Sequence, residues 1–229
     1  MTKKHLKRLN MPNTWDVKKK GLTYIKRPLP GPHGFDHGQA LSVVMRDMLG
    51  IAQTNKEVKN ILHNHEVMVD GIKRTEVKFP VGLMDTITIP AIKESYRIIL
   101  NKKGKLDSIK IDEKDAGLKV IRINGKTMSK KGLQLNLADG KNVLADKTES
   151  KVGDSLLIEV PKNIIKDVLK LEKGSLVMIT GGKYTGIIAN VSDIKTKTMT
   201  CKTKDGEFET SKKYAYVVGK DKPVVKIEE

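Results

Sequence analysis

The stretch from Thr180 to Gly186, Thr-Gly-Gly-Lys-Tyr-Thr-Gly, has residue types that could cradle a phosphate. A nucleotide-binding P-loop has the pattern Gly-x-x-x-x-Gly-Lys followed by Ser or Thr, whose hydroxyl holds Mg²⁺, and it leads into a helix. Here Tyr184 follows Lys183, no glycine stands at the earlier position, and the apolar run at 187–191 predicts a strand. The sequence therefore excludes nucleotide chemistry of the P-loop type.

The alternative interpretation of this stretch is a tight turn between two strands, at 174–180 and 187–194. Gly181, Gly182 and Gly186 allow positive backbone angles and close chain approach. We expect Lys183 and Tyr184 to lie exposed on the turn, where a phosphate, ribose or base can be met. Tyr184 packing over the mouth of a small barrel is the competing expectation.

No catalytic constellation is found elsewhere. His33 and His37 flank Asp36, but without a cysteine or a clear fourth ligand we expect no metal site. The carboxylates between residues 112 and 115 have lysine neighbours, which indicates a solvated face rather than an acid/base pair. We expect no enzymatic activity, no cofactor and no small-molecule substrate.

The charge of the chain is informative because it is large and uneven. The net charge is +17, and residues 1–40 hold nine Lys and Arg against two Asp, whereas residues 41–95 are balanced at seven and seven. Such a surplus favours a polyanionic partner, since phosphates neutralised by Lys or Arg release condensed counterions. Only six of the 44 basic residues are Arg. Lysines act as point charges on phosphates, so the composition favours recognition of a nucleic-acid backbone and its shape. The alternative is a general lysine bias that only aids solubility.

The residues expected to contact RNA are basic or aromatic and come from three parts of the chain. They are Lys3, Lys4, Lys7, Arg8, Lys18, Lys19, Lys20, Arg27 and His33 in the N-terminal part, Arg46, Lys56, Lys59 and Arg74 in the second part, and Lys183, Tyr184, Lys212 and Lys213 near the C-terminus.

The length of 229 residues fits one large domain or two to three small ones. The single cysteine, Cys201, cannot form an internal disulfide, which indicates a reducing cytoplasm. No apolar run approaches the ~20 residues that span a bilayer, and no hydrophobic segment follows the N-terminal charges. We expect a cytoplasmic protein with no membrane partner.

Residues 1–37 are predicted to form a basic extended arm. They contain four prolines and show no sustained period, and proline pushes its preceding residue toward extended conformations. Trp15 and Tyr24 are large anchors that either pin the arm to the body or stack on bases.

Residues 38–95 show the most regular pattern. Apolar residues recur at helical spacing from Leu41 to Leu49, and Gly50 follows as a stop. A second helix opens with a capping box, Thr54 as N-cap and Glu57 three residues later. An Asp70–Gly71 turn then predicts a hairpin, and a further strand is expected at 85–89.

Residues 96–171 are predicted to form a central, mostly antiparallel β domain, with turns at Asn124–Gly125 and Asp139–Gly140 and a helix at 163–171. A helical turn is expected at 112–118. Residues 172–229 supply the strands around the Thr180–Gly186 turn, an Asp205–Gly206 hairpin and a tail.

Two parts of the chain resemble known RNA-binding modules. The helix pair and hairpin resemble the alpha-L module named after bacterial ribosomal protein S-four, on the residues 49–52, Thr54, 67–71 and 85–87. His65 stands where that family usually has glycine. The strand, Gly-rich turn and strand at 174–194 resemble the KOW motif, a short element of an SH3-like β barrel.

The whole chain resembles the archaeal and eukaryotic small-subunit ribosomal protein S-four-e family. The residues that carry this resemblance are 4–9, Gly31-Pro32-His33, 79–85 and Thr180-Gly181-Gly182, and the short C-terminal end resembles the archaeal form. The resemblance implies an α+β, multi-domain fold with an arm, an alpha-L module, a β domain and a KOW barrel. It also implies a structural component of the ribosome whose partners are small-subunit rRNA and neighbouring ribosomal proteins.

Two other functions stay open at this point. An RNA-modifying enzyme with an alpha-L module would need a separate catalytic domain, for which little chain is left. A KOW-containing transcription elongation factor would not explain the alpha-L module or the arm.

Overall fold

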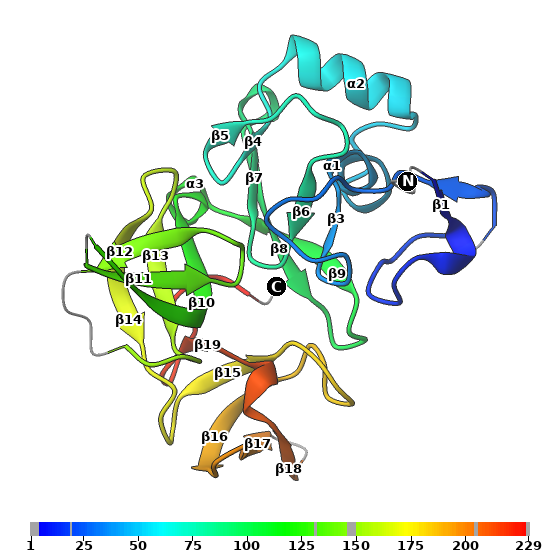
Figure 1. Cartoon of the computed structure of the whole chain (residues 1–229). Helices are drawn as coiled ribbons and strands as arrows, with labels where there is room; N and C mark the ends of the chain where they lie inside the picture. Colours follow the sequence, from blue (N-terminus) through cyan, green and yellow to red (C-terminus); the bar gives the residue numbers. More distant parts are fainter. Residues whose placement is uncertain (1–4, 19, 131, 146–149, 204–205, 228–229) are drawn as a thin grey trace. The chain divides into compact units, whose positions relative to one another are not determined.

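A computed structural model describes residues 5–18, 20–130, 132–145, 150–203 and 206–227 (Figure 1). Strands dominate these residues, and the helices are short. The chain divides into two compact units, one formed by residues 1–99 and 105–117 and the other by residues 100–104 and 118–228. The predicted fold class is therefore confirmed in its coarse form, as a mostly β chain with several sheets and a few helices.

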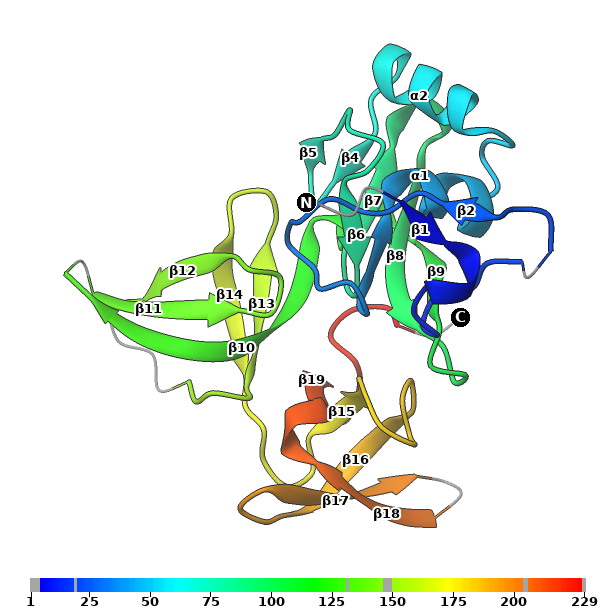
Figure 2. The same ribbon diagram turned by 45° about the vertical axis from the view of Figure 1, so that its right-hand side comes forward.

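The N-terminal segment contains a pair of short strands and its own buried anchors. Strands β1 (Leu6–Lys7) and β2 (Tyr24–Ile25) pair antiparallel (Figure 2). Trp15 is only 1% exposed, and its ring centroid lies 5.4 Å from that of Phe35. Of the two roles weighed for the aromatic residues, Trp15 has the anchoring one, whereas Tyr24 stays 56% exposed.

The helix pair lies where the apolar spacing predicts it. It consists of α1 (Leu41–Val43), the π-helix η2 (Val44–Met48) and α2 (Asn55–Asn64). The inward positions of the first helix, Leu41, Val44 and Met45, are at most 1% exposed. The chain leaves this helix at Gly50, whose φ is +66°, a backbone conformation that glycine adopts without a side-chain clash.

The predicted capping box of α2 is confirmed. The backbone N–H of Glu57 donates to Thr54 Oγ1 at 3.2 Å, and the backbone N–H of Thr54 donates to Glu57 Oε2 at 3.3 Å. Val58 and Leu62 are fully buried, so the helix is held by its apolar stripe as well as by its cap.

The first unit holds a five-stranded sheet with the order β5-β4-β7-β8-β9, and β3 pairs with β6 beside it. The strands are β3 (Gly38–Ala40), β4 (Met68–Val69), β5 (Ile72–Lys73), β6 (Pro80–Gly82), β7 (Thr86–Ile89), β8 (Glu94–Leu100) and β9 (Leu106–Ile111). Asp70 and Gly71 both have positive φ, 51° and 72°, as the predicted two-residue hairpin turn requires. The short helices η3 (Pro90–Ile92) and α3 (Glu113–Ala116) complete the unit, and α3 is the predicted helical turn.

The second unit contains two antiparallel sheets. The first has the order β12-β11-β10-β13-β14, with β10 (Leu118–Ser129), β11 (Gly132–Leu137), β12 (Asn142–Ala145), β13 (Ser155–Glu159) and β14 (Ile164–Leu169). The second has the order β18-β17-β16-β15-β19, with β15 (Leu176–Ile179), β16 (Ile188–Ile194), β17 (Thr198–Thr203), β18 (Gly206–Ser211) and β19 (Ala215–Gly219). The 3-10 helix η4 (Lys212–Tyr214) joins β18 to β19.

Two predictions for the first of these sheets are wrong. Asn124 and Gly125 do not form a turn, because β10 continues through them with a register shift between Ile123 and Gly125 (Figure 2). The segment predicted as a helix at 163–171 is strand β14, which pairs with β13. Its β-branched residues favour a strand. The edge of β13 that does not pair with β10 also needs hydrogen-bond partners for its backbone, so pairing with β13 overrides the helical spacing of the apolar residues. The turn at Asp139–Gly140 is confirmed, while Asp205 of the expected last hairpin lies outside the described residues.

The glycines of the Thr180–Gly186 turn serve two different purposes. Gly182 and Gly186 have φ of 87° and 82°, and a Cβ on Gly181 would lie 2.6 Å from a ring carbon of Tyr214. A Cβ on Gly186 would lie 1.8 Å from the carbonyl oxygen of Asn101, whereas a Cβ on Gly182 would meet nothing closer than 3.5 Å. Gly186 is therefore required by close backbone approach, and Gly182 by its backbone angle alone.

This difference predicts unequal effects of the same substitution. Gly182→Ala should destabilise the unit by about 1–2 kcal/mol, the cost of a left-handed backbone for a residue with a Cβ. Gly186→Ala should cost clearly more, because the backbone of residue 101 must also move. Urea unfolding of both variants measures the two values. Equal losses of unfolding free energy in the two variants would show that the close contact between residue 186 and the backbone of residue 101 does not contribute to stability.

Candidate nucleic-acid interface

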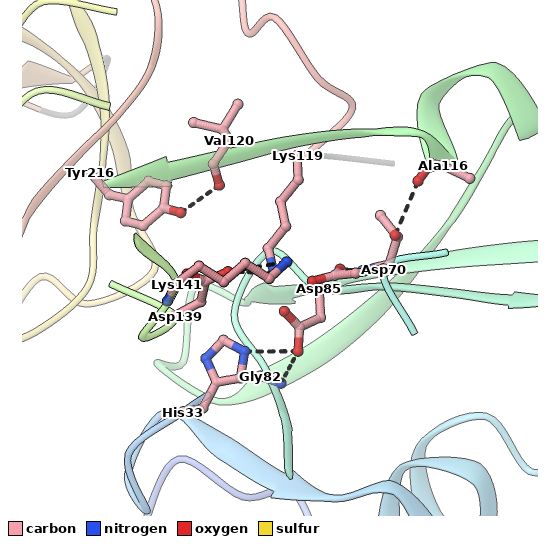
Figure 3. A network of polar contacts seen from close by, with 11 residues as sticks. His33, Asp70, Gly82, Asp85, Ala116, Lys119, Val120, Asp139, Lys141 and Tyr216 are labelled. Atoms are coloured by element: carbon pink, nitrogen blue, oxygen red, sulfur yellow. Dashed lines mark hydrogen bonds and ion pairs between the residues drawn. The ribbon is translucent and has the colours of Figure 1, made fainter. Parts of the chain in front are cut away.

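The side chain of His33 is buried between two glycines. It is 6% exposed, and its Nε2 lies 2.8 Å from Asp85 Oδ2 (Figure 3). The same oxygen accepts a hydrogen bond from the backbone N–H of Gly82 at 2.9 Å. A Cβ on Gly82 would lie 2.5 Å from the His33 ring, and one on Gly38 would lie 2.7 Å from His33 Cβ. The His33 ring is therefore enclosed and already bonded within the protein, and its contact with RNA stays a prediction.

The residues around His33 join the arm to strand β6. The backbone N–H of Leu29 donates to the carbonyl of Lys78 at 2.9 Å, and a Cβ on Gly31 would lie 2.6 Å from Pro80 Cγ. The Gly31-Pro32-His33 motif and the 79–85 motif are thus two halves of one interlock. Their residue types are explained by packing rather than by contact with a ligand.

Helix α2 has two exposed lysines. Lys56 and Lys59 are exposed, on the side of α2 opposite the buried Val58 and Leu62. One amide at the start of the helix is occupied, since the backbone N–H of Glu57 donates to Thr54 Oγ1. Just before the helix, Glu57 Oε2 accepts from the backbone N–H of Gln53 at 2.8 Å. This bond and those of Thr54 lower the pKa of the Glu57 carboxyl. The carboxylate therefore already occupies the start of the helix, where an outside anion would otherwise be attracted.

The two arginines predicted to share this face are engaged within the protein. Arg46 donates from Nε and Nη2 to the two carboxylate oxygens of Asp47, at 2.9 and 2.6 Å, and this bond raises the pKa of Arg46. The guanidinium carbon of Arg74 lies 4.3 Å from the ring centroid of Phe79. Of the four residues predicted to form a basic face, the two arginines therefore have partners within the protein, and the RNA contact of the face stays a prediction.

The arm shows the same division between lysine and arginine. Lys7, Lys18 and Lys20 are exposed. Arg8 instead donates from its guanidinium to the backbone carbonyls of residues 17 and 18, and so closes the arm on itself. The predicted residues Lys3, Lys4 and Lys19 lie outside the described part of the chain.

In the second unit, Lys183 is exposed on its turn, as predicted, but Tyr184 is half-buried. The Tyr184 ring stacks on Phe208, with centroids 4.1 Å apart and planes at 24°. Tyr184 therefore follows the competing expectation of packing on the sheet. Lys213 is exposed, and Lys212 is half-buried in η4.

Sequence reasoning missed the two partners that decide these outcomes. The sequence places Asp85 in two family motifs and Phe208 in a C-terminal strand, but it predicts no side-chain partner for either. Phe208 is the one aromatic residue of β18, a signal that could have suggested a partner for Tyr184. Nothing in the spacing of His33 and Asp85, 52 residues apart, indicates that they meet.

Within the described residues, no group of three or more His, Cys, Asp or Glu side chains is placed to hold a metal ion. Cys201 is buried, which raises the pKa of its thiol to about 11. The thiol is thus protonated at neutral pH and is a poor metal ligand or nucleophile. No helix in the described part of the chain has the length and apolar character to cross a membrane.

Exposed lysines on an arm, a short helix and a strand turn, carried by a chain of net charge +17, are features of an RNA-binding protein. Residues 92–165 match the family model "Ribosomal family S4e", and residues 2–36 match the "RS4NT (NUC023) domain" model. The chain belongs to the ribosomal S4e family.

Similar proteins match over nearly the whole chain. The small ribosomal subunit protein eS4 of Methanosphaera stadtmanae is 41% identical over 99% of this chain and 96% of its own. The protein of the same name from Methanococcus vannielii is 39% identical over 97% of both chains. The crystal structure of the 30S ribosomal protein S4e from Thermoplasma acidophilum superposes with a TM-score of 0.70, at 31% identity, over 81% of this chain and 96% of that one.

The burial of His33 leads to a testable difference between two neighbouring histidines. His33→Ala leaves the buried Asp85 carboxylate with one bond fewer and should lower the free energy of unfolding by about 1–3 kcal/mol. His37→Ala is the matched control. Because His37 is exposed, this variant should have the same free energy of unfolding as the wild type. Thermal and urea unfolding measure both variants. An unchanged stability of the His33 variant would contradict the interlock.

Proposed function

We propose that the protein is a structural component of the small ribosomal subunit and binds its rRNA, as an archaeal-type member of the family. The observation that carries this proposal is the 41% identity to a small ribosomal subunit protein over 99% of the chain. The other reported relatives have small-subunit names as well, which favours this function over an elongation factor or an RNA-modifying enzyme. The protein would act in the cytoplasm as part of the ribosome, without catalysing a reaction, and its further partners are neighbouring ribosomal proteins.

Within this function we assign the modules that the sequence suggested. The helix pair and hairpin of residues 38–95 serve as an alpha-L module, supported by the buried faces of α1 and α2 and by the capping box. The sheet of β15–β19 serves as a KOW barrel, supported by the glycines of the 180–186 turn. The arm at 1–37, the central β region at 96–171 and the C-terminal part at 172–229 complete the four segments.

The RNA contacts are assigned to exposed lysines, because the arginines and His33 are engaged within the protein. The lysines in question are Lys7, Lys18, Lys20, Lys56, Lys59, Lys183 and Lys213. A lysine ammonium is a mobile point charge, so it suits phosphates whose positions are set by the shape of the RNA rather than by base sequence.

A pulldown tests the function itself. The tagged full chain, expressed in the cells it comes from, should recover intact small subunits with their rRNA. Recovery of RNA polymerase without small subunits would contradict the proposal and support the elongation-factor alternative.

The role of the α2 face gives a salt-dependent prediction. The double variant Lys56→Gln, Lys59→Gln should bind small-subunit rRNA more weakly. The slope of log K against log salt should become less negative by about 1.4–1.8, since each lost phosphate contact removes roughly 0.7–0.9. Titration of fluorescently labelled rRNA at several salt concentrations measures the slope.

The matched control removes the same charge elsewhere. Lys195 and Lys202 are exposed but lie 3.2 and 3.8 Å from the carboxylates of Glu209 and Glu207. Their double Gln variant should keep a slope near that of the wild type. If both double variants change the slope equally, the α2 face has no special place in RNA binding.

A further inference from the structure

A hollow of about 820 Å³ lies beside the β1–β2 pair in the first unit. It is bordered by aromatic, basic and amide side chains, among them His5, Lys7, Asn10, Tyr24, Arg27 and Phe35. The volume is within the ~300–1,000 Å³ typical of pockets that hold small ligands. A smaller hollow of about 440 Å³ adjoins it and is also bordered by Tyr24, together with Lys26, Asn55 and Lys78.

Strand pairing holds the ring of Tyr24 outward. Leu6 pairs with Ile25, and both are buried, whereas the next pair, Lys7 and Tyr24, is exposed. Successive side chains of a strand point to opposite faces, so Lys7 and Tyr24 lie side by side on the solvent face. The burial of Leu6 and Ile25 therefore fixes Tyr24 in a position where it contributes little to the core.

The ring of Tyr24 has free area in an aromatic setting. It is 56% exposed, and its centroid lies 5.8 Å from that of His5, with the two planes at 60°. Phe35, which borders the same hollow, is 36% exposed and has the Arg27 guanidinium carbon 5.5 Å from its centroid. A tilted rather than stacked neighbour leaves a face of Tyr24 on which a flat ring can lie.

The charges around the two hollows have one sign. Lys7, Lys26, Arg27 and Lys78 border them, and no carboxylate does among the described residues that line them. An acidic group would be attracted here, and a single apolar side chain of a protein partner would leave these charges unmatched. A nucleotide satisfies both features, since it carries a flat base and a phosphate on either side.

We propose that Tyr24 is a stacking platform for one unpaired base of RNA, with Lys7 on an adjoining phosphate. This inference rests on the proposed function and deepens it, because it specifies single-stranded rather than helical RNA at this surface. A duplex cannot supply the base, since its bases are already stacked on one another. Asn10 offers an amide that can hydrogen-bond to a base edge.

The test compares Tyr24→Ala with Tyr24→Phe in the full chain. The probes are a short unstructured oligouridylate and an RNA duplex of the same length. Tyr24→Ala should bind the oligouridylate about 5- to 150-fold more weakly, the effect of one lost base–aromatic stack, whereas Tyr24→Phe should bind within about twofold of the wild type. The salt slope should stay unchanged in both, because the ring carries no charge. Duplex binding should be equal in all three proteins.

Folding and the source of any loss are checked separately. Thermal unfolding shows whether Tyr24→Ala keeps the β1–β2 pair, and ultraviolet crosslinking of the wild type to oligouridylate, with mass spectrometry of the adducts, should find the peptide that contains Tyr24. Crosslinks only to other peptides would overturn the proposal even if the variant fails to fold.

The outcomes separate this inference from the function on which it rests. A wild-type protein that joins small subunits, with a folded Tyr24→Ala variant that binds oligouridylate equally well, overturns the stacking platform alone. The same RNA affinity with loss of a neighbouring ribosomal protein from the recovered particle would show that the hollow binds protein, and it also overturns the inference. A wild type that neither joins small subunits nor binds their rRNA defeats the proposed function.

Discussion

The buried carboxylate of Asp85 is the constraint on which the N-terminal unit depends. It is 2% exposed, and a carboxylate taken out of water must have its charge matched by hydrogen bonds. The Gly82 amide supplies one bond from the turn before β7, and His33 supplies another from the arm. Because His33 can reach this oxygen only if residues 38 and 82 lack side chains, the two glycines, the histidine and the aspartate form one unit. The path of the arm across β6 follows from that arrangement.

The two kinds of basic residue are used differently in this protein. Each of the six arginines has a contact within its own unit. Arg8 donates to carbonyls of the arm, Arg46 to Asp47, Arg97 to the carbonyl of Asp115 and Arg122 to Asn124, while Arg27 and Arg74 lie over phenylalanine rings. The guanidinium has a rigid fork of donors and a weakly hydrated face, so it bonds well inside a protein. The surplus charge that reaches solvent is largely lysine, which is adequate for neutralising phosphates without reading sequence.

In the C-terminal sheet, a turn with the residue types of a phosphate-binding loop is explained by packing between strands. Three glycines and a lysine resemble a phosphate cradle, yet Gly181 admits the Tyr214 ring and Gly186 admits the carbonyl of Asn101. Tyr184 lies on Phe208, which leaves Lys183 as the exposed side chain at the tip, with its Nζ 5.6 Å from the Tyr184 ring. The hydroxyl of Tyr216, on β19, donates to the carbonyl of Val120 at 2.6 Å and ties this sheet to β10 (Figure 3). The glycines and Tyr184 of the turn are therefore used in packing, and Lys183 is its exposed charge.

The sequence by itself determined the local elements whose signals lie within a few residues. The capping box of Thr54 and Glu57, the Asp70–Gly71 turn, the alternating strands and the uneven charge all depend on neighbours along the chain. Only the tertiary structure decided which polar and aromatic side chains have partners within the protein and which stay exposed. His33 bonds to Asp85 and Tyr184 stacks on Phe208, while Tyr24 is left exposed. Residues 164–169 form strand β14 because β13 offers a pairing edge. Burial and pairing depend on partners far away in the chain, and no local spacing encodes such a distance.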